Sequence, residues 1–209
     1  MTGESRRPTG PDDYSYLNRI SEAEWGYLAG ILVGEGHLGI YGTVSAPQFR
    51  LEVQIGDQEV CNHLAGLFGG VVRAGQLGGV TYRRHDGIRR TFTNMYRWVV
   101  IDGYLIREIM QRTIPYLQGN KLTQARRYAD FVDAKLMCWE HKRQQGRSIY
   151  TEEEQRVLLR LAYEARKTAL GGRKSWLEVW EKRLQELENA GTSNRTQEDS
   201  LTGGSNGTN

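Results

Sequence analysis

The residues with the clearest potential for chemistry lie in one short stretch, residues 25–36. Glycines at positions 26, 30 and 34 recur every four residues, so in a helix they form a row along one side. Such a row costs helix stability but lets a second backbone approach very closely. Glu35 follows at the end of this helix, where the helix dipole already places partial negative charge. If two such helices pack side by side, two carboxylates and several free carbonyl oxygens converge, which predicts a pair of divalent metal sites.

The residues around the glycine row indicate how this helix is flanked and how it ends. Leu28, Ile31 and Leu32 offer a wide apolar surface beside the row. Gly36 follows Glu35, and a glycine is the usual residue just past the last turn of a helix. We therefore expect the helix to end at Glu35, with Gly36 as its C′ residue.

After Gly36 the spacing of apolar residues changes from that of a helix to that of strands. Over residues 48–55 apolar and polar side chains alternate without a fault. The apolar row predicts a core-facing side that comprises Phe49, Leu51, Val53 and Ile55. The opposite row carries four long hydrogen-bonding side chains, namely Gln48, Arg50, Glu52 and Gln54. Two interpretations remain open here: the solvated face of an amphipathic strand, and a surface that reads base edges in the DNA major groove.

Two further strands are predicted over residues 71–84 and 88–100, joined by a turn at His85-Asp86-Gly87. An Asp-Gly pair between strand residues is a strong signal for a tight hairpin turn. Four arginines crowd the tip, where they repel one another unless they bind phosphate, namely Arg83, Arg84, Arg89 and Arg90. In the second strand, the alternation places Arg97 on the polar side.

Helices complete the predicted order of elements. A helix over 57–68 separates the two strand pairs, another runs from an N-cap at Asp102 to about Thr113, and a third follows Pro115. The order over residues 21–135 is therefore αββαββα. Additional C-terminal helices are expected over about 151–189, the first opened by a capping box at Thr151 and Glu154. One domain over 14–190 is expected between a disordered lead-in, 1–13, and a disordered tail, 191–209.

Composition limits the classes of function. The 209 residues suffice for one domain of ordinary core size. The net charge is only +3, but residues 37–127 hold 12 Lys and Arg against 6 Asp and Glu, whereas residues 151–209 hold 9 against 10. This basic middle favours a nucleic-acid surface confined to one region. No apolar run approaches the ~20 residues that span a bilayer, so no membrane partner is expected. Two isolated cysteines, Cys61 and Cys138, favour a reducing intracellular compartment, whether cytoplasm, nucleoid or organelle.

Residues 28–36, Leu-Ala-Gly-Ile-Leu-Val-Gly-Glu-Gly, resemble the nonapeptide of the LAGLIDADG homing endonucleases, whose helix also ends in an acidic residue followed by glycine. Val33 replaces the first acid of the family name, a position that is not a metal ligand in the family. The Pro-Tyr-Leu segment before Lys121 and the Gln124-Ala125 pair after it also resemble a family connection, with about one extra residue. The resemblance implies an α+β fold, the αββαββα LAGLIDADG endonuclease fold with additional C-terminal helices.

The resemblance further implies a site-specific, intron-encoded homing endonuclease that hydrolyses both strands of DNA with Mg²⁺ or Mn²⁺. One nonapeptide per chain implies a homodimer on a long pseudo-palindromic site. It implies that Glu35 and the Gly34 carbonyl bind the metal, that Lys121 acts on the phosphate or the attacking water, and that Asp57 lies at the edge of the active site. The implied dimer interface comprises Gly26, Tyr27, Gly30, Val33 and Gly34. The implied DNA-binding residues are Tyr41, Gln48, Arg50, Glu52, Gln54, Arg73, Arg83, Arg84, Arg89, Arg90 and Arg97.

One departure from the family and two alternative functions follow from the same residues. Relatives often carry a basic residue early in the helix after the second strand, whereas residues 58–64 offer only His63, which puts the cleavage rate in question. A maturase would use this fold to bind intron RNA and assist splicing, and a DNA-binding regulator would use it without cleaving. Both need only the basic faces, so the presence of Glu35 and Lys121 favours cleavage.

Overall fold

The structure is a computed structural model that describes residues 11–43, 46–75, 81–83, 89–91, 94–168 and 177–189. Its elements occur in the order η1 (Pro11–Arg19), α1 (Glu22–Gly34), β1 (Gly36–Thr43), β2 (Ala46–Ile55), α2 (Gln58–Phe68), β3 (Val71–Ala74), β4 (Thr81–Arg83), β5 (Arg89–Thr91), β6 (Tyr96–Val100), α3 (Gly103–Thr113), η2 (Ile114–Tyr116), α4 (Gly119–Gln144) and α5 (Glu152–Lys167). Residues 177–189 form one more helical segment. The α+β class and the αββαββα order are therefore confirmed. The first helical turn, η1, already begins at Pro11, inside the segment expected to be a lead-in.

Four strands form one antiparallel sheet in the order β1-β2-β6-β3. Its register sets Glu52 of β2 between His37 of β1 and Val99 of β6, and sets Arg97 of β6 between Gln54 and Arg73. Because directly opposite residues point to the same side of a sheet, all these residues share one face. This face carries the polar row predicted for residues 48–55.

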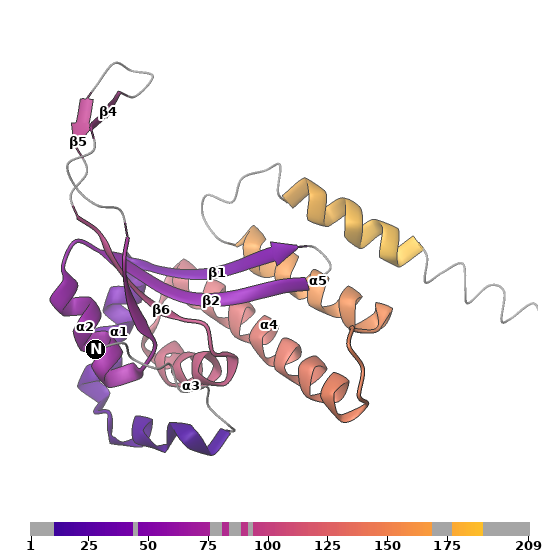
Figure 1. Cartoon of the computed structure of the whole chain (residues 1–209), viewed down its shortest axis with the longest axis horizontal. Coiled ribbons are helices and arrows are strands. Elements are labelled where there is room, and N and C mark those ends of the chain that lie inside the picture. Colours follow the sequence, from indigo (N-terminus) through magenta and orange to yellow (C-terminus); the bar gives the residue numbers. More distant parts are fainter. Residues whose placement is uncertain are drawn as a thin grey trace, which may run out of the picture.

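The predicted hairpin over 71–100 consists of two separate pieces. Strands β3 and β6 belong to the main sheet, whereas β4 and β5 pair only with each other and lie beyond its end (Figure 1). Arg83 lies opposite Arg89 in this small ladder. The predicted turn at His85-Asp86-Gly87, together with Arg84, lies outside the described residues.

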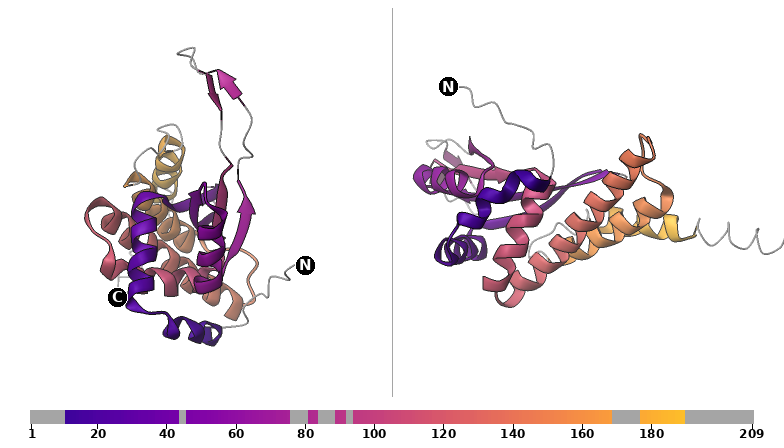
Figure 2. Two further views of the ribbon diagram at one scale, coloured as in Figure 1. Left: turned by 90° about the vertical axis from the view of Figure 1, so that its left-hand side faces the viewer. Right: turned by 90° about the horizontal axis from the view of Figure 1, so that it is seen from below.

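Helices and the other sheet face enclose the core. Figures 1 and 2 show α3 and α4 packed along one side of β1 and β2, with α1 and α2 beside them. The side chains between these layers are fully buried and include Leu51, Val53, Trp98, Ile106 and Phe131. The predicted apolar row of β2 is therefore core-facing, although Phe49 and Ile55 at its ends are only partly buried.

The start of α1 follows its sequence closely. Ser21 and Glu24 form a capping box, in which the Ser21 hydroxyl accepts a hydrogen bond from the Glu24 N–H and the Glu24 carboxylate accepts one from the Ser21 N–H. The side of α1 that carries Leu28 and Leu32 is buried in the core of its own chain. The expectation that these two leucines flank the glycine row is therefore wrong. They lie on the opposite side of α1 and pack it against the core.

The end of α1 differs from the expected C′ cap. Gly36 is the first residue of β1 and is not among the described glycines with a left-handed backbone. It is required for space, because a Cβ there would lie 2.5 Å from the Cα of Leu32 and 2.6 Å from its carbonyl oxygen. The chain thus passes directly from α1 to β1, and Glu35 is held at a fixed corner between them.

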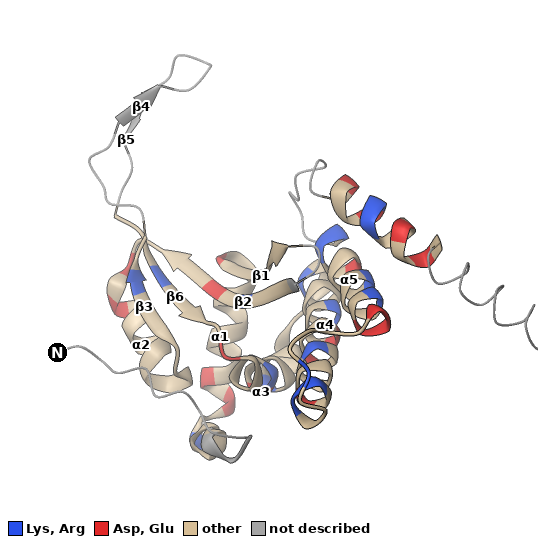
Figure 3. Ribbon diagram, turned by 45° about the vertical axis from the view of Figure 1, so that its right-hand side comes forward, with Lys and Arg blue, Asp and Glu red and all other residues tan. Residues whose placement is uncertain are grey.

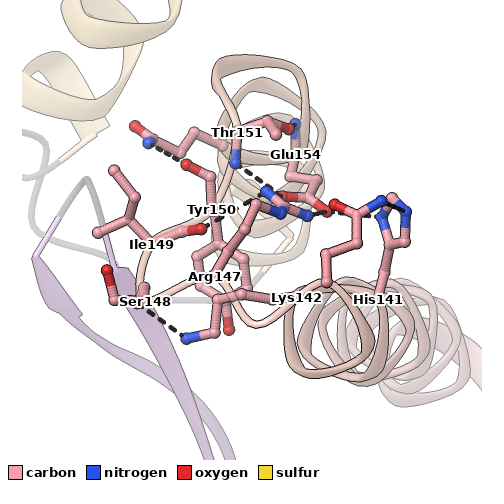
Figure 4. Close-up of polar contacts among 10 residues, drawn as sticks. His141, Lys142, Arg147, Ser148, Ile149, Tyr150, Thr151 and Glu154 are labelled. Carbon is pink, nitrogen blue, oxygen red and sulfur yellow. Dashed lines mark hydrogen bonds and ion pairs between the residues drawn. The ribbon is translucent and has the colours of Figure 1, made fainter.

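A polar cluster fixes the corner between α4 and α5 (Figure 4). Arg147 donates hydrogen bonds from both terminal nitrogens to the Glu154 carboxylate, at 2.8 and 2.9 Å, and holds the pKa of Glu154 far below its ordinary value. Thr151 and Glu154 also form the predicted capping box. Among the described residues, no helix has the length and apolarity needed to cross a membrane.

Candidate active site and nucleic-acid interface

The exposed corner after α1 brings Glu35 close to Lys121 of α4. The Nζ of Lys121 donates a hydrogen bond to the carbonyl oxygen of Gly36, at 2.9 Å, and partial burial lowers the pKa of this lysine. Glu35 is exposed, and no described side chain forms an ion pair with it. The ammonium group of Lys121 therefore lies at the backbone of the residue that follows the exposed Glu35. Both were singled out from the sequence as catalytic residues.

The outer face of α1 is not covered by the rest of the chain that the structure describes. An added Cβ at Gly26, Gly30 or Gly34 would meet no atom within 4 Å. Tyr27 and Val33 on the same helix remain 43% and 52% exposed, although both are large and apolar. The five residues predicted for the dimer interface thus lie on the side of α1 that the chain itself does not cover. This leaves α1 with two apolar sides, one used by its own core and one free.

The polar face of the main sheet contains a stacked arrangement around Arg50. Gly39 lies opposite Arg50 in the register, and the ring of Tyr41 folds back over Gly39 into the space that a Cβ would need. The guanidinium carbon of Arg50 lies 4.3 Å from the centre of the Tyr41 ring. The Tyr41 ring is thereby placed to support one arginine side chain by a cation–π contact.

Glu52 connects Arg50 to Arg97 on this face. Its carboxylate lies 3.0 Å from the Nε of Arg50 and 3.6 Å from the Nε of Arg97, and its side chain is only 7% exposed. Gln54 lies directly opposite Arg97 and is partly buried, whereas Gln48 and Arg73 are exposed. The main sheet therefore brings together seven of the eleven residues that the sequence proposed for DNA binding on one face: Tyr41, Gln48, Arg50, Glu52, Gln54, Arg73 and Arg97.

Asp57 has a structural task in addition to its predicted place near the active site. It is the N-cap of α2, and its Oδ1 accepts hydrogen bonds from the backbone N–H groups of Glu59 and Val60. His63, the basic residue of α2 noted in the sequence, is exposed and lies edge-on to Tyr27, with ring centres 5.9 Å apart.

His37 is a residue of this site that the sequence did not nominate. It follows Gly36, lies opposite Glu52 in the register and contacts the Tyr41 ring edge-on at 5.9 Å. Its pKa is lowered mainly by partial desolvation, against the opposing effect of Glu52. The signal was present in the strand alternation, because His37 and Tyr41 are four residues apart on the same side.

A divalent metal fits the Glu35 corner only if other molecules complete the site. Among the described residues, no group of three or more His, Cys, Asp or Glu side chains could hold a metal ion. Mg²⁺ commonly binds through one or two carboxylates together with phosphates and waters. The exposed Glu35 carboxylate, beside backbone carbonyls at the negative end of α1, matches that kind of partial site.

For the hairpin arginines, the structure gives the position of the backbone alone. Arg83, Arg89 and Arg90 lie in the β4–β5 ladder, and Arg84 lies outside the described residues. In Figure 3 the ribbon of the main sheet is mostly tan with isolated charged bands, whereas α4 and α5 carry charges of both signs along their length. The polar face therefore offers a few defined charges rather than a continuous basic surface.

Several solved structures share this fold. The archaeal intron-encoded homing endonuclease I-Vdi141I, solved in complex with DNA, matches 80% of this chain with 98% of its own, at a TM-score of 0.56 and 16% identity. The homing endonuclease I-CvuI, solved with its target and Ca, matches 80% of this chain with 96% of its own, at 0.52 and 18% identity. The LAGLIDADG meganuclease I-CpaMI, bound to uncleaved DNA, matches 80% of this chain with 50% of its own, at 0.54 and 13% identity.

The protein therefore has the fold of the LAGLIDADG homing endonucleases. This confirms, for the fold, the resemblance found in residues 28–36. No protein-family model and no curated protein matches the sequence.

Proposed function

We propose that the protein is a homodimeric, metal-dependent endonuclease that cuts both strands of DNA at a long pseudo-palindromic site. The observation that carries this proposal is the hydrogen bond from Lys121 to the Gly36 carbonyl, which brings an ammonium group to the residue after the exposed Glu35. This contact joins two distant parts of the chain, in a fold whose solved neighbours include DNA-bound homing endonucleases.

The dimer would form along the open side of α1. Two copies packed on the glycine row would bring two Glu35 carboxylates to the two-fold axis. The match to I-CpaMI supports this arrangement, because the present chain covers half of that chain and a second copy would supply the other half. The polar sheet face of each copy would then follow the major groove of one half-site.

The residues at the Glu35 corner would divide the chemistry between them. Glu35, with the Gly34 carbonyl, would hold Mg²⁺ or Mn²⁺, which lowers the pKa of an attacking water and stabilises the leaving 3′ oxygen. Lys121 would stabilise negative charge that develops on the phosphate or orient the attacking water. Its partial burial and its hydrogen bond to the Gly36 carbonyl support this role, because they restrict the positions that the ammonium group can take.

Selection of cleaved sites from a random DNA library in Mg²⁺ tests the proposal. The wild-type protein should yield a pseudo-palindromic site, and Glu35→Gln and Lys121→Met should lose cleavage of that site while binding it within a few-fold in Ca²⁺. Lys142→Met is a matched control, because Lys142 also lies on α4 and donates to a backbone carbonyl, that of Ser148, at 3.2 Å. Sequence-selective binding without cleavage would instead indicate a non-cleaving DNA-binding protein, and selective binding of RNA would indicate a maturase.

A further inference from the structure

We infer that Glu52 is a positioning residue that holds Arg50 and Arg97 as a prearranged pair of guanine-reading side chains. This inference rests on the proposed function, because it concerns how the polar sheet face recognises DNA. It gives Glu52 a task different from the direct base contact expected from the sequence.

The geometry of Glu52 favours contact with protein over contact with DNA. Its two carboxylate oxygens lie toward different arginines, Oε2 at 3.0 Å from Arg50 Nε and Oε1 at 3.6 Å from Arg97 Nε. Its side chain is 7% exposed, whereas those of Arg50 and Arg97 are 29% and 38% exposed. The carboxylate therefore lies beneath the two arginines, which are the groups that an approaching base would meet.

The atoms that Glu52 uses leave the reading edge of each arginine available. Both ion pairs involve Nε, the guanidinium nitrogen nearest the backbone. The terminal nitrogens lie beyond these contacts, although the Tyr41 side chain also forms a hydrogen bond with Arg50, and their N–H groups fit the O6 and N7 acceptors that guanine presents in the major groove. An arginine already held by a carboxylate also loses less side-chain freedom when it binds.

The surroundings of the pair show why one carboxylate is needed at this place. Arg97 lies directly opposite Arg73 in the β3–β6 ladder, and like charges in that position repel. Among the described residues on this face of the main sheet, Glu52 is the only acidic one. Glu52 offsets the repulsion, while the Tyr41 ring contacts Arg50, whose guanidinium carbon lies 4.3 Å from the ring centre.

The first experiment finds which base pairs the two arginines read. Sites bound by the full-length protein are selected from random DNA in Ca²⁺, and the selection is repeated with Arg50→Lys and Arg97→Lys, which keep the charge but lose the planar fork. Each variant should lose a guanine preference at one base pair per half-site. If neither variant relaxes the preference at any base pair, the inference is wrong.

The second experiment tests Glu52 itself. Glu52→Gln and the shorter Glu52→Asp should both lose discrimination at those same two base pairs, by about fivefold or more at each. For Glu52→Gln, affinity for unrelated DNA should stay equal or rise, because an anion leaves the DNA-facing side. Glu108→Gln is the matched control, since Glu108 is paired with Arg112 at 3.5 Å on α3 and should leave preference unchanged.

Other outcomes separate the possible failures. Loss of preference at a third base pair, a cytosine, would show that Glu52 contacts DNA directly and would overturn the positioning role. Unchanged preference in the Glu52 variants would overturn it as well. In both cases the wild-type protein still binds a specific site, whereas failure of the wild-type protein to bind any DNA selectively would overturn the proposed function instead.

Discussion

Glu35 and Gly36, at the end of α1, differ in how closely the rest of the chain surrounds them. Glu35 is exposed, while Gly36 is enclosed so tightly that a Cβ would collide with the backbone of Leu32. The enclosed residue fixes the direction in which the exposed one leaves the helix. A carboxylate placed in this way at the negative end of a helix is unfavourable unless a cation binds it.

This placement predicts that Glu35→Gln stabilises the metal-free protein, by up to about 1 kcal/mol per subunit. The reason is that the variant removes an anion from the negative end of α1 and keeps its shape. Urea unfolding in EDTA measures the difference. Glu22→Gln is the control at the other end of α1, where an anion is favourable, so it should lower the free energy of unfolding. A loss of stability in Glu35→Gln would mean that donors already satisfy this carboxylate.

Lys135 shows a second charge in an unfavourable place. It is 7% exposed, donates a hydrogen bond to the Pro47 carbonyl oxygen, and has its pKa lowered to about 8, mainly by burial and also by the charge of Lys142. Burial of an ammonium group penalises the charged form in the folded state alone. The penalty is therefore complete below about pH 8 and fades as the pH rises toward 10.5, the ordinary lysine pKa.

We predict that the stability of the wild-type protein relative to Lys135→Met rises by about 3 kcal/mol between pH 7 and pH 10.5. Chemical unfolding of both proteins across this range provides the measurement, and other titrating groups cancel in the difference. Lys182→Met, a change at an exposed lysine, should give a difference that does not vary with pH. A flat difference for Lys135→Met would show that its ammonium is solvated in the folded protein.

Some features of single residues could be predicted from the sequence and others could not. The N-caps at Asp57, Asp102 and Thr151 were predictable, because each side chain bonds to a backbone group two or three residues away. The contact of Lys121 with Gly36 joins residues 85 positions apart in the sequence, so the spacing of residues could not predict it. The role of Glu52 was missed for the same reason, since it depends on which strand lies next to β2.

At the scale of elements, α1 combines a buried side with an open one. Leu28 and Leu32 lie two residues from the glycines, about 200° around the helix, so helix periodicity itself places them opposite the row, and the expectation that they flank it was wrong. The glycine spacing did identify the open side, because the three glycines form one row on the helix and a Cβ at each would meet no atom within 4 Å. The split of the predicted hairpin into β3–β6 and β4–β5 was not foreseen, since both pieces share one strand-like pattern.

The open side of α1 leads to a prediction with two readouts. Gly30→Ala adds a Cβ that meets no atom within 4 Å in the single chain, so it should strengthen the helix by up to about 1 kcal/mol. In a dimer that packs on the glycine row, the same methyl group forces two backbones apart. We therefore expect Gly30→Ala to shift the protein toward a folded monomer, as measured by light scattering over a range of concentrations.

Gly66→Ala supplies the control for this change. Gly66 is also a helical glycine with open space around its Cβ position, but it lies on α2. It should gain similar helix stability and remain a dimer. If Gly30→Ala is as dimeric as Gly66→Ala, the glycine row is not the interface.

At the scale of the whole molecule, six of the twelve Lys and Arg residues in 37–127 lie on described strands, in two separate places. The main sheet holds Arg50, Arg73 and Arg97 on one face, and the separate β4–β5 ladder holds Arg83, Arg89 and Arg90. The first group lies among side chains that fix its direction, which suits reading of bases. The second group lies at a projecting ladder where Arg83 and Arg89 are directly opposite, which suits binding of phosphate.

This division predicts two different responses when DNA binding is measured as a function of salt. Each phosphate contact contributes about 0.9 to the slope of log affinity against log salt concentration, so Arg83→Ala or Arg89→Ala should lower the slope by about 1.8 in a dimer. Gln54→Ala, on the main sheet opposite Arg97, should relax preference at particular base pairs and leave the slope nearly unchanged. Arg183→Ala is the control, because Arg183 is paired with Glu186 at 3.0 Å in the helical segment 177–189 and should change neither quantity. Equal slopes for Arg83→Ala and Gln54→Ala would contradict the division, because backbone contact and base reading would then not be assigned to separate parts of the molecule.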